Sequence, residues 1–170
     1  MSNMFQKCES LTSLDLGNFD TSQVTSMRNM FDSCISLTNI NLKKFNTENV
    51  ENMEYMFEGC SNLKSIDVSN FDTSKTTLMN GMFSECIALT SIDLSHFQTF
   101  NLVDVSRMFA ESSSLAYIDL TGVYMYNAKT YFKIFDGVSS SGTIIYNPKL
   151  IRPEIIDLFP PNWEYKEVED

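Results

Sequence analysis

The 170-residue chain contains little of what catalytic, nucleic-acid-binding and membrane-spanning proteins require. It has one histidine, His96, and no Gly-rich phosphate loop among its six glycines, so a nucleophile–base pair and a nucleotide site are not expected. It contains 12 Lys and Arg but 22 Asp and Glu. This excess of negative charge argues against nucleic-acid phosphates and anionic membranes as partners. No apolar run reaches the roughly 18 residues of a bilayer-spanning helix. We therefore expect no enzyme, no cofactor, no nucleic-acid partner and no membrane insertion.

Proline is also scarce, and all four prolines lie between residues 148 and 161. Before them a 26-residue pattern recurs without insertion or deletion, starting at Met4, Met30, Met56, Met82 and Met108. Such self-similarity at a fixed period is typical of repeat proteins. The sequence predicts an array of five repeats over residues 1–133, the first truncated and the fifth degenerate. Residues 134–170 are predicted to form a partial repeat and a cap.

Each repeat predicts one strand followed by one helix. Leu63, Ile66 and Val68 stand in a Leu-x-x-Leu-x-Leu pattern whose alternation fits a strand with one buried face. Residues 50–57 carry apolar side chains three and four positions apart, the spacing of one helical face. We expect an α/β fold. More specifically, we expect a right-handed leucine-rich repeat solenoid with parallel strands on the concave face and short helices on the convex face.

The last part of the chain is expected to close the array. Residues 144–146 fit a strand, prolines bracket a short helix from about Glu154 to Phe159, and a final strand is expected over residues 163–170. No equivalent cap precedes Met4, so the uncapped N-terminal end is a candidate for self-association. Because the chain also starts within a repeat, we expect it to be part of a longer protein.

The strings Met30-Phe31-Asp32-Ser33-Cys34-Ile35-Ser36-Leu37-Thr38 and Ser65-Ile66-Asp67-Val68-Ser69-Asn70-Phe71-Asp72-Thr73-Ser74 carry a family likeness. They resemble the BspA-like leucine-rich repeats found in surface proteins and lipoproteins of many bacteria, and the likeness covers residues 4–119. The resemblance implies a surface-exposed protein with a role in adhesion to host matrix proteins, host-cell attachment or coaggregation. The chain departs from that family in lacking a signal peptide and a lipid-attachment cysteine, so a location at the cell surface or outside the cell is expected only if it belongs to a longer exported protein.

The cysteines and methionines recur with the repeat. Side chains stacked in one file point in parallel, so we expect buried free thiols, with neither disulfides nor a tetrahedral metal site, at Cys8, Cys34, Cys60 and Cys86. Eight of the ten methionines are expected to fill the core: Met4, Met27, Met30, Met53, Met56, Met79, Met82 and Met108. A second apolar file is expected from Phe5, Phe31, Phe57, Phe83 and Phe109.

Outward strand positions would line the concave face, where repeat arrays usually bind partners. The candidate ligand-binding residues there are Asp15, Asn41, Asp67, Asp93, Tyr117 and Asp119. Repulsion between neighbouring carboxylates can be relieved by a cation, by a basic partner, or by water and side-chain rotation. No Asp-x-Asp-x-Asp-Gly loop occurs, so no calcium site is expected. Tyr124, Tyr126 and Tyr131 fit either a protein contact or a cap.

These observations predict a non-enzymatic interaction module that binds a host or neighbouring-cell protein or glycan. The alternative is a structural spacer or a self-associating segment with no ligand of its own.

Overall fold

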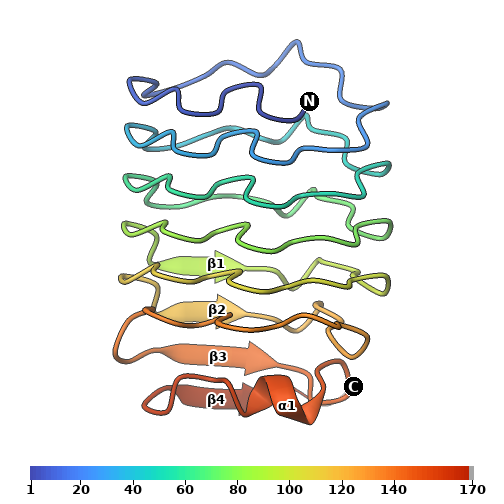
Figure 1. Cartoon of the computed structure of the whole chain (residues 1–170), viewed down its shortest axis with the longest axis vertical. Coiled ribbons are helices and arrows are strands. Elements are labelled where there is room, and N and C mark those ends of the chain that lie inside the picture. Colours follow the sequence, from blue (N-terminus) through green and yellow to red (C-terminus); the bar gives the residue numbers. More distant parts are fainter. Residues whose placement is uncertain (169–170) are drawn as a thin grey trace.

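The computed structural model describes residues 1–168 and stacks the chain in layers along its longest axis (Figure 1). Segments 26 residues apart lie in neighbouring layers. The Phe31 N–H, for example, donates to the Met56 carbonyl at 2.9 Å, and the Phe57 N–H donates to the Met82 carbonyl at 3.0 Å. We use the word column for a set of residues that repeats every 26 positions. The periodicity of the sequence is thus a periodicity of contacts in space.

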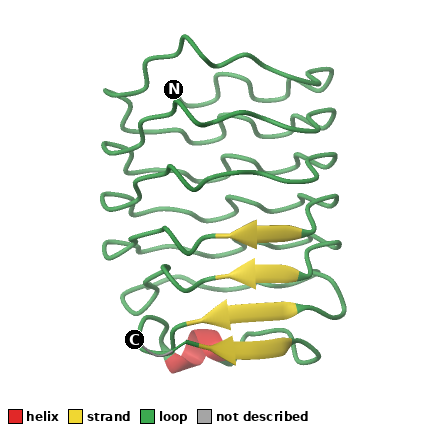
Figure 2. Cartoon of the chain, turned by 180° about the vertical axis from the view of Figure 1, so that it is seen from behind, coloured by secondary structure: helices red, strands yellow, loops and turns green. Residues whose placement is uncertain are grey.

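One side of the stack carries a parallel sheet in the order β1 (Ser91–Asp93), β2 (Tyr117–Asp119), β3 (Thr143–Tyr146) and β4 (Glu164–Glu167), seen together in Figure 2. The central residues Ile92 and Ile118 face each other in register and are buried, while Ser91 and Asp93 on either side of Ile92 are exposed. This confirms the predicted strands of the fourth and fifth repeats and the strand at residues 144–146. The chain is an α/β protein with a four-stranded parallel sheet and little helix.

The strands predicted for the first three repeats were wrong: within the described chain, residues 1–90 contain no strand. The predicted alternation of side chains is still present, with Leu42 and Val68 buried and Asn41 exposed. The backbones on this side lie too far apart for a regular ladder, as the Lys64 N–H reaches the Thr38 carbonyl only at 3.5 Å. In these repeats, the other backbone hydrogen bonds between layers lie on the side of the stack opposite the predicted strands.

The convex helices were also predicted wrongly, since α1 (Pro153–Ile156) is the only α-helix among residues 1–168. Each layer contains residues in the left-handed backbone region, such as Asn29 at φ 53° and Ser33 at φ 58°. A right-handed helix cannot include them. Their N–H groups donate instead to the next layer, Asn29 to the Glu54 carbonyl at 2.9 Å and Ser33 to the Glu58 carbonyl at 2.7 Å. Bonds between layers therefore replace the bonds within a helix.

The predicted aromatic file is confirmed. Phe31 and Phe57 stack with ring centroids 5.5 Å apart and planes within 8° of parallel, and Phe57 stacks on Phe83 at 5.8 Å. The methionine prediction is confirmed at seven positions, which are fully buried, except that Met4 is 48% exposed. Met4 lies in the first layer, where the core is covered on one side only, which explains the difference.

The cysteines are free, as predicted. Burial is confirmed at 34, 60 and 86 but not at Cys8, which is half-buried in the first layer. Each of the three buried thiols donates to a phenylalanine carbonyl in the preceding layer, as in Cys60 Sγ to the Phe31 carbonyl at 3.2 Å. Ser112 replaces cysteine in this column, and its hydroxyl donates to the Phe83 carbonyl at 2.7 Å. Burial raises the pKa of Cys34 to about 11 and that of Cys86 to about 12, so these thiols stay neutral.

The C-terminal end closes one end of the stack, where α1 lies beside β4 (Figure 1). The predicted short helix is confirmed, although α1 begins one residue earlier and ends three residues earlier than expected. The ring of Phe159 packs edge-on against Phe135 at 5.3 Å, and the Trp163 indole N–H donates to the Ser139 carbonyl at 2.8 Å. The predicted final strand is confirmed as β4. Residues 169–170, which were assigned to the same strand, lie outside the described residues.

Candidate functional site

The predicted site residues lie on one surface, the outer side of the sheet and its continuation toward the N-terminal layers. We keep for this surface the name under which it was predicted, the concave face. Within the sheet, the backbone register sets Asp93 beside Asp119 and Ser91 beside Tyr117. Asp67, Asn41 and Asp15 continue the aspartate column through the earlier layers and are exposed. The structure therefore brings Asp93, Tyr117 and Asp119 together, while Asp15 lies at the far end of the face.

The column has a structural role that the sequence analysis did not assign. Asp67 Oδ1 accepts hydrogen bonds from the Ser69 N–H at 3.1 Å and from the Ser69 hydroxyl at 2.6 Å. An aspartate or asparagine that binds the backbone two residues later fixes a turn. Asn41 does the same with its amide oxygen, which accepts the Lys43 N–H at 3.1 Å. A carboxylate is thus not required for the turn, since an amide serves as well.

These turns also keep the carboxylates charged. The hydroxyl and N–H of Ser69 hold the pKa of Asp67 below its usual value, and Ser95 lowers the pKa of Asp93 in the same way. Among residues 1–168, no lysine, arginine or histidine forms an ion pair with either carboxylate or with Asp119. The concave face therefore presents oriented negative charges that form no ion pair among these residues, although Lys43 and His96 lie near enough to lower the pKa of Asp67 further, and His96 does the same for Asp93.

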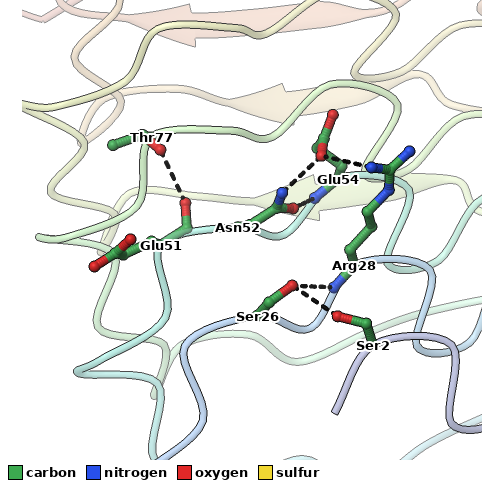
Figure 3. Close-up of polar contacts among 7 residues, drawn as sticks. All are labelled: Ser2, Ser26, Arg28, Glu51, Asn52, Glu54 and Thr77. Atoms are coloured by element: carbon green, nitrogen blue, oxygen red, sulfur yellow. Dashed lines mark hydrogen bonds and ion pairs between the residues drawn. The ribbon is translucent and has the colours of Figure 1, made fainter.

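A polar seam away from the concave face behaves differently (Figure 3). There the Asn52 amide donates to Glu54 at 2.6 Å and accepts the Glu54 N–H at 2.9 Å, while Arg28 Nη1 lies 3.6 Å from the Glu54 carboxylate. The Thr77 hydroxyl donates to the Glu51 carbonyl at 3.1 Å and so connects two layers. In this seam the polar groups satisfy one another, whereas the concave carboxylates form no ion pair within residues 1–168.

Comparison with known proteins identifies the family. Residues 1–123 match the family described as "Mycoplasma protein of unknown function, DUF285". The chain belongs to the DUF285 family. No curated protein and no solved structure matches it. In the described part of this DUF285 chain, no helix is long and apolar enough to cross a membrane, and no group of three or more His, Cys, Asp or Glu is arranged to hold a metal ion.

Tyr117 is an aromatic side chain on the concave face of this DUF285 protein. Its column otherwise holds small polar residues: Ser13, Asn39, Ser65 and Ser91. The ring is 38% exposed. Partial burial raises the pKa of Tyr117, and the negative charges of Asp119 and Asp93 raise it further. An aromatic surface thus lies within the field of two carboxylates, an arrangement that can accept a cationic or polar group of a partner.

Further along the chain, the structure exposes aromatic residues that sequence reasoning missed or left open. Phe100 is 57% exposed and Tyr126 is 51% exposed, so neither covers the last layer as a cap would. Tyr131 is half-buried, with the Arg152 guanidinium 5.7 Å above its ring. The signal for Phe100 was present in its column, where the earlier repeats have Ser22, Glu48 and Ser74.

Proposed function

We propose that this DUF285 chain is a right-handed leucine-rich repeat solenoid of the BspA-like type and serves as a non-enzymatic interaction module of a bacterial surface protein. In this proposal it binds a protein or glycan of a host or neighbouring cell through the concave face. The stacking of 26-residue layers supports the repeat architecture. Layered arrays present long, rigid surfaces on which binding residues can be placed independently of the core.

The observation that carries the proposal is the set of oriented carboxylates on the face that Tyr117 shares, none of which forms an ion pair among the described residues. Hydrogen bonds from Ser69 and Ser95 fix the carboxylates of Asp67 and Asp93 before any partner arrives, which reduces the entropy lost on binding. Because parallel strands lie about 4.8 Å apart, neighbouring carboxylates repel unless a partner supplies positive charge or hydrogen-bond donors. Binding at this face would relieve that repulsion.

The same geometry favours binding over catalysis. A pair of catalytic carboxylates needs environments that push their pKa values apart. Here similar hydrogen bonds lower the pKa of both Asp67 and Asp93. The two groups are therefore equivalent anions, which suits recognition and gives neither the role of an acid.

The test uses substitutions that the repeats themselves tolerate. Asp67→Asn and Asp93→Asn remove charge but keep the turn acceptor, as Asn41 does, and Tyr117→Ser restores the residue found at Ser91. The purified chain is screened against immobilised host matrix proteins and a glycan array, with and without calcium. We expect the triple variant to lose at least about tenfold in affinity, about 1.4 kcal/mol, with its melting temperature preserved.

The control for this screen is Glu48→Gln with Glu51→Gln, which removes two exposed charges outside the concave face. It should bind as the wild type does. Unchanged affinity of the concave-face variant, or an equal loss in the control, would remove this face from the proposal.

The second candidate function is a structural spacer or a self-associating segment. It is favoured by the first layer, where Phe5 and Leu11 are half-buried although their column neighbours Phe31 and Leu37 are fully buried. A second copy packed on this layer would bury those side chains. Light scattering over a range of concentrations tests this. Self-association would be supported by an average molar mass that rises with concentration in the wild type but not in Phe5→Ser. A monomeric mass at every concentration would reject it.

A further inference from the structure

Three aromatic side chains, two of them exposed and one half-buried, lie together beyond β1 and β2, and we call Phe100, Tyr124 and Tyr126 the aromatic ledge. The ring centroids of Phe100 and Tyr124 are 5.6 Å apart, and those of Tyr124 and Tyr126 are 6.4 Å apart, with the planes tilted by 49° and 41°. The outer rings of Phe100 and Tyr126 are each more than half exposed. The three rings therefore form one continuous aromatic surface that solvent reaches.

The backbone beneath the ledge is held firmly. The Thr99 hydroxyl, which is buried, accepts the Tyr124 N–H at 2.8 Å and donates to the Tyr124 carbonyl at 3.1 Å. The Asn101 amide donates to the Ser74 carbonyl at 2.8 Å, which ties the ledge to the preceding layer. The rings are thus presented by a fixed scaffold, and little backbone entropy would be lost when they bind a ligand.

The fold does not require aromatic residues at these positions. In the preceding layer, Asp72 occupies the column of Tyr124, and its Oδ1 accepts the Ser74 N–H at 2.9 Å and the Ser74 hydroxyl at 2.6 Å. Ser74 in turn shares its column with Phe100 and Tyr126. In the two later layers, Phe100 and Tyr126 stand where Ser74 takes part in a stabilising turn. Their exposed rings gain little free energy from burial. That replacement is expected where the rings contact something outside the chain.

The two segments that carry the ledge contain no charged residue, although the adjoining layer places Asp72 and Lys75 next to one of them. Residues 97–103 and 122–128 contain no Asp, Glu, Lys or Arg, in a chain whose net charge is −10. The equivalent segment of the preceding layer contains Asp72 and Lys75. The polar residues that stand near the rings in the sequence include three amides, Gln98, Asn101 and Asn127. A ligand matched to this surface has apolar faces, hydrogen-bonding edges and no charge.

We propose that the aromatic ledge binds a neutral glycan. The C–H faces of successive pyranose rings would lie on the rings of Phe100 and Tyr126, and the sugar hydroxyls would exchange hydrogen bonds with the amides and the tyrosine hydroxyls. A positively charged protein partner would find its complement on the concave face, whereas the segments that carry the ledge supply no charged side chain. The inference rests on the proposed binding function and names the ligand class of a second surface beside the concave face.

The experiment compares two variants of the whole chain. Phe100→Ser, Tyr124→Asp and Tyr126→Ser together restore the residues of the preceding layer, so this ledge variant should melt at or above the wild-type temperature. The second variant is the concave-face triple described above. Each protein is titrated by calorimetry with cellohexaose, chitohexaose and maltohexaose, and with a heparin hexasaccharide as the charged control.

We expect at least one neutral hexasaccharide to bind the wild type with a Kd of about 1 mM or tighter. The ledge variant should lose at least about tenfold in this affinity, and the concave-face variant should keep it. The proposal is overturned if no neutral hexasaccharide binds the folded wild type, if only the heparin hexasaccharide binds, or if the ledge variant binds as well as the wild type. Failure of the concave-face proposal alone would appear as unchanged protein binding in the concave-face variant, and it would leave these titrations unchanged.

Discussion

Glu58 should make the stability of this protein fall as the pH rises toward neutrality. Burial raises the pKa of Glu58 to about 7 from 4.5, and the negative charges of Asp32 and Glu85 add to this, while Arg107 opposes it. The folded state therefore holds a proton that the unfolded state has released between these two values. The resulting contribution to stability is fully present below pH 4.5 and is lost as the pH rises to about 7.

The expected magnitude follows from the same two pKa values. At about 1.36 kcal/mol per pH unit, the interval corresponds to about 3.4 kcal/mol. Glu58 is only half-buried, and water screens part of this energy, so we expect about 1 to 2 kcal/mol. Glu58→Gln removes the ionisation, and the change fits the column because Gln6 occupies it and donates to Asp32 at 2.6 Å.

The assay is urea unfolding of the wild type and of Glu58→Gln at pH 4.5 and pH 8. We expect the variant to be the more stable protein at pH 8 and to lie close to the wild type at pH 4.5. Exposed Glu48→Gln is the matched control and should follow the wild type at both pH values. Parallel pH profiles for Glu58→Gln and the wild type, or a variant that is less stable at pH 8, would refute the reasoning.

Three further substitutions test the columns of the core. Phe57→Ala should cost about 4 kcal/mol in urea unfolding, since it removes a fully buried ring stacked on both sides; a loss below about 2 kcal/mol would contradict the stacked file. Cys60→Ser should lower the unfolding free energy by less than about 1.5 kcal/mol, because Ser112 makes the same hydrogen bond in its column, and a larger loss would show that the slot requires sulfur. Thr73→Val should cost about 1 to 3 kcal/mol, because the buried hydroxyl accepts the Gln98 N–H at 2.8 Å, and a neutral result in the same assay would mean that water replaces it.

Sequence periodicity predicted the layers and the buried columns, but it could not predict the backbone on the side where helices were expected. Apolar residues three and four positions apart satisfy a helix, yet they equally satisfy a chain that turns through left-handed residues and bonds to the next layer. The usable signal was the residue type at Asn29, Gly59 and Gly81, since glycine and asparagine tolerate positive φ. Tyr55 and Arg107 share a column with Asn29 and adopt the same conformation. The residue types of this column therefore do not consistently indicate a positive φ.

The face of the candidate site was predictable, and the role of its residues was predictable only in part. Strand alternation placed Asp67 and Asp93 on the outer surface, where the structure has them. Their turn-forming role could also have been inferred, because each stands two residues before a serine, the spacing of a side-chain-to-backbone turn. Whether a partner uses the same carboxylates depends on binding free energies, which repeat spacing does not encode.

Comparing a residue with the other members of its column is a stronger test of function than considering its residue type alone. Ser112 departs from its column but donates the same hydrogen bond as the cysteine it replaces, so the fold explains it. Tyr117, Phe100 and Tyr126 also depart from their columns, yet each places a large ring in solvent where a small or polar residue serves the other layers. Folding alone does not favour such exposed area. Contact with a partner gives these three rings a physical reason, and the column-restoring variants separate that reason from stability.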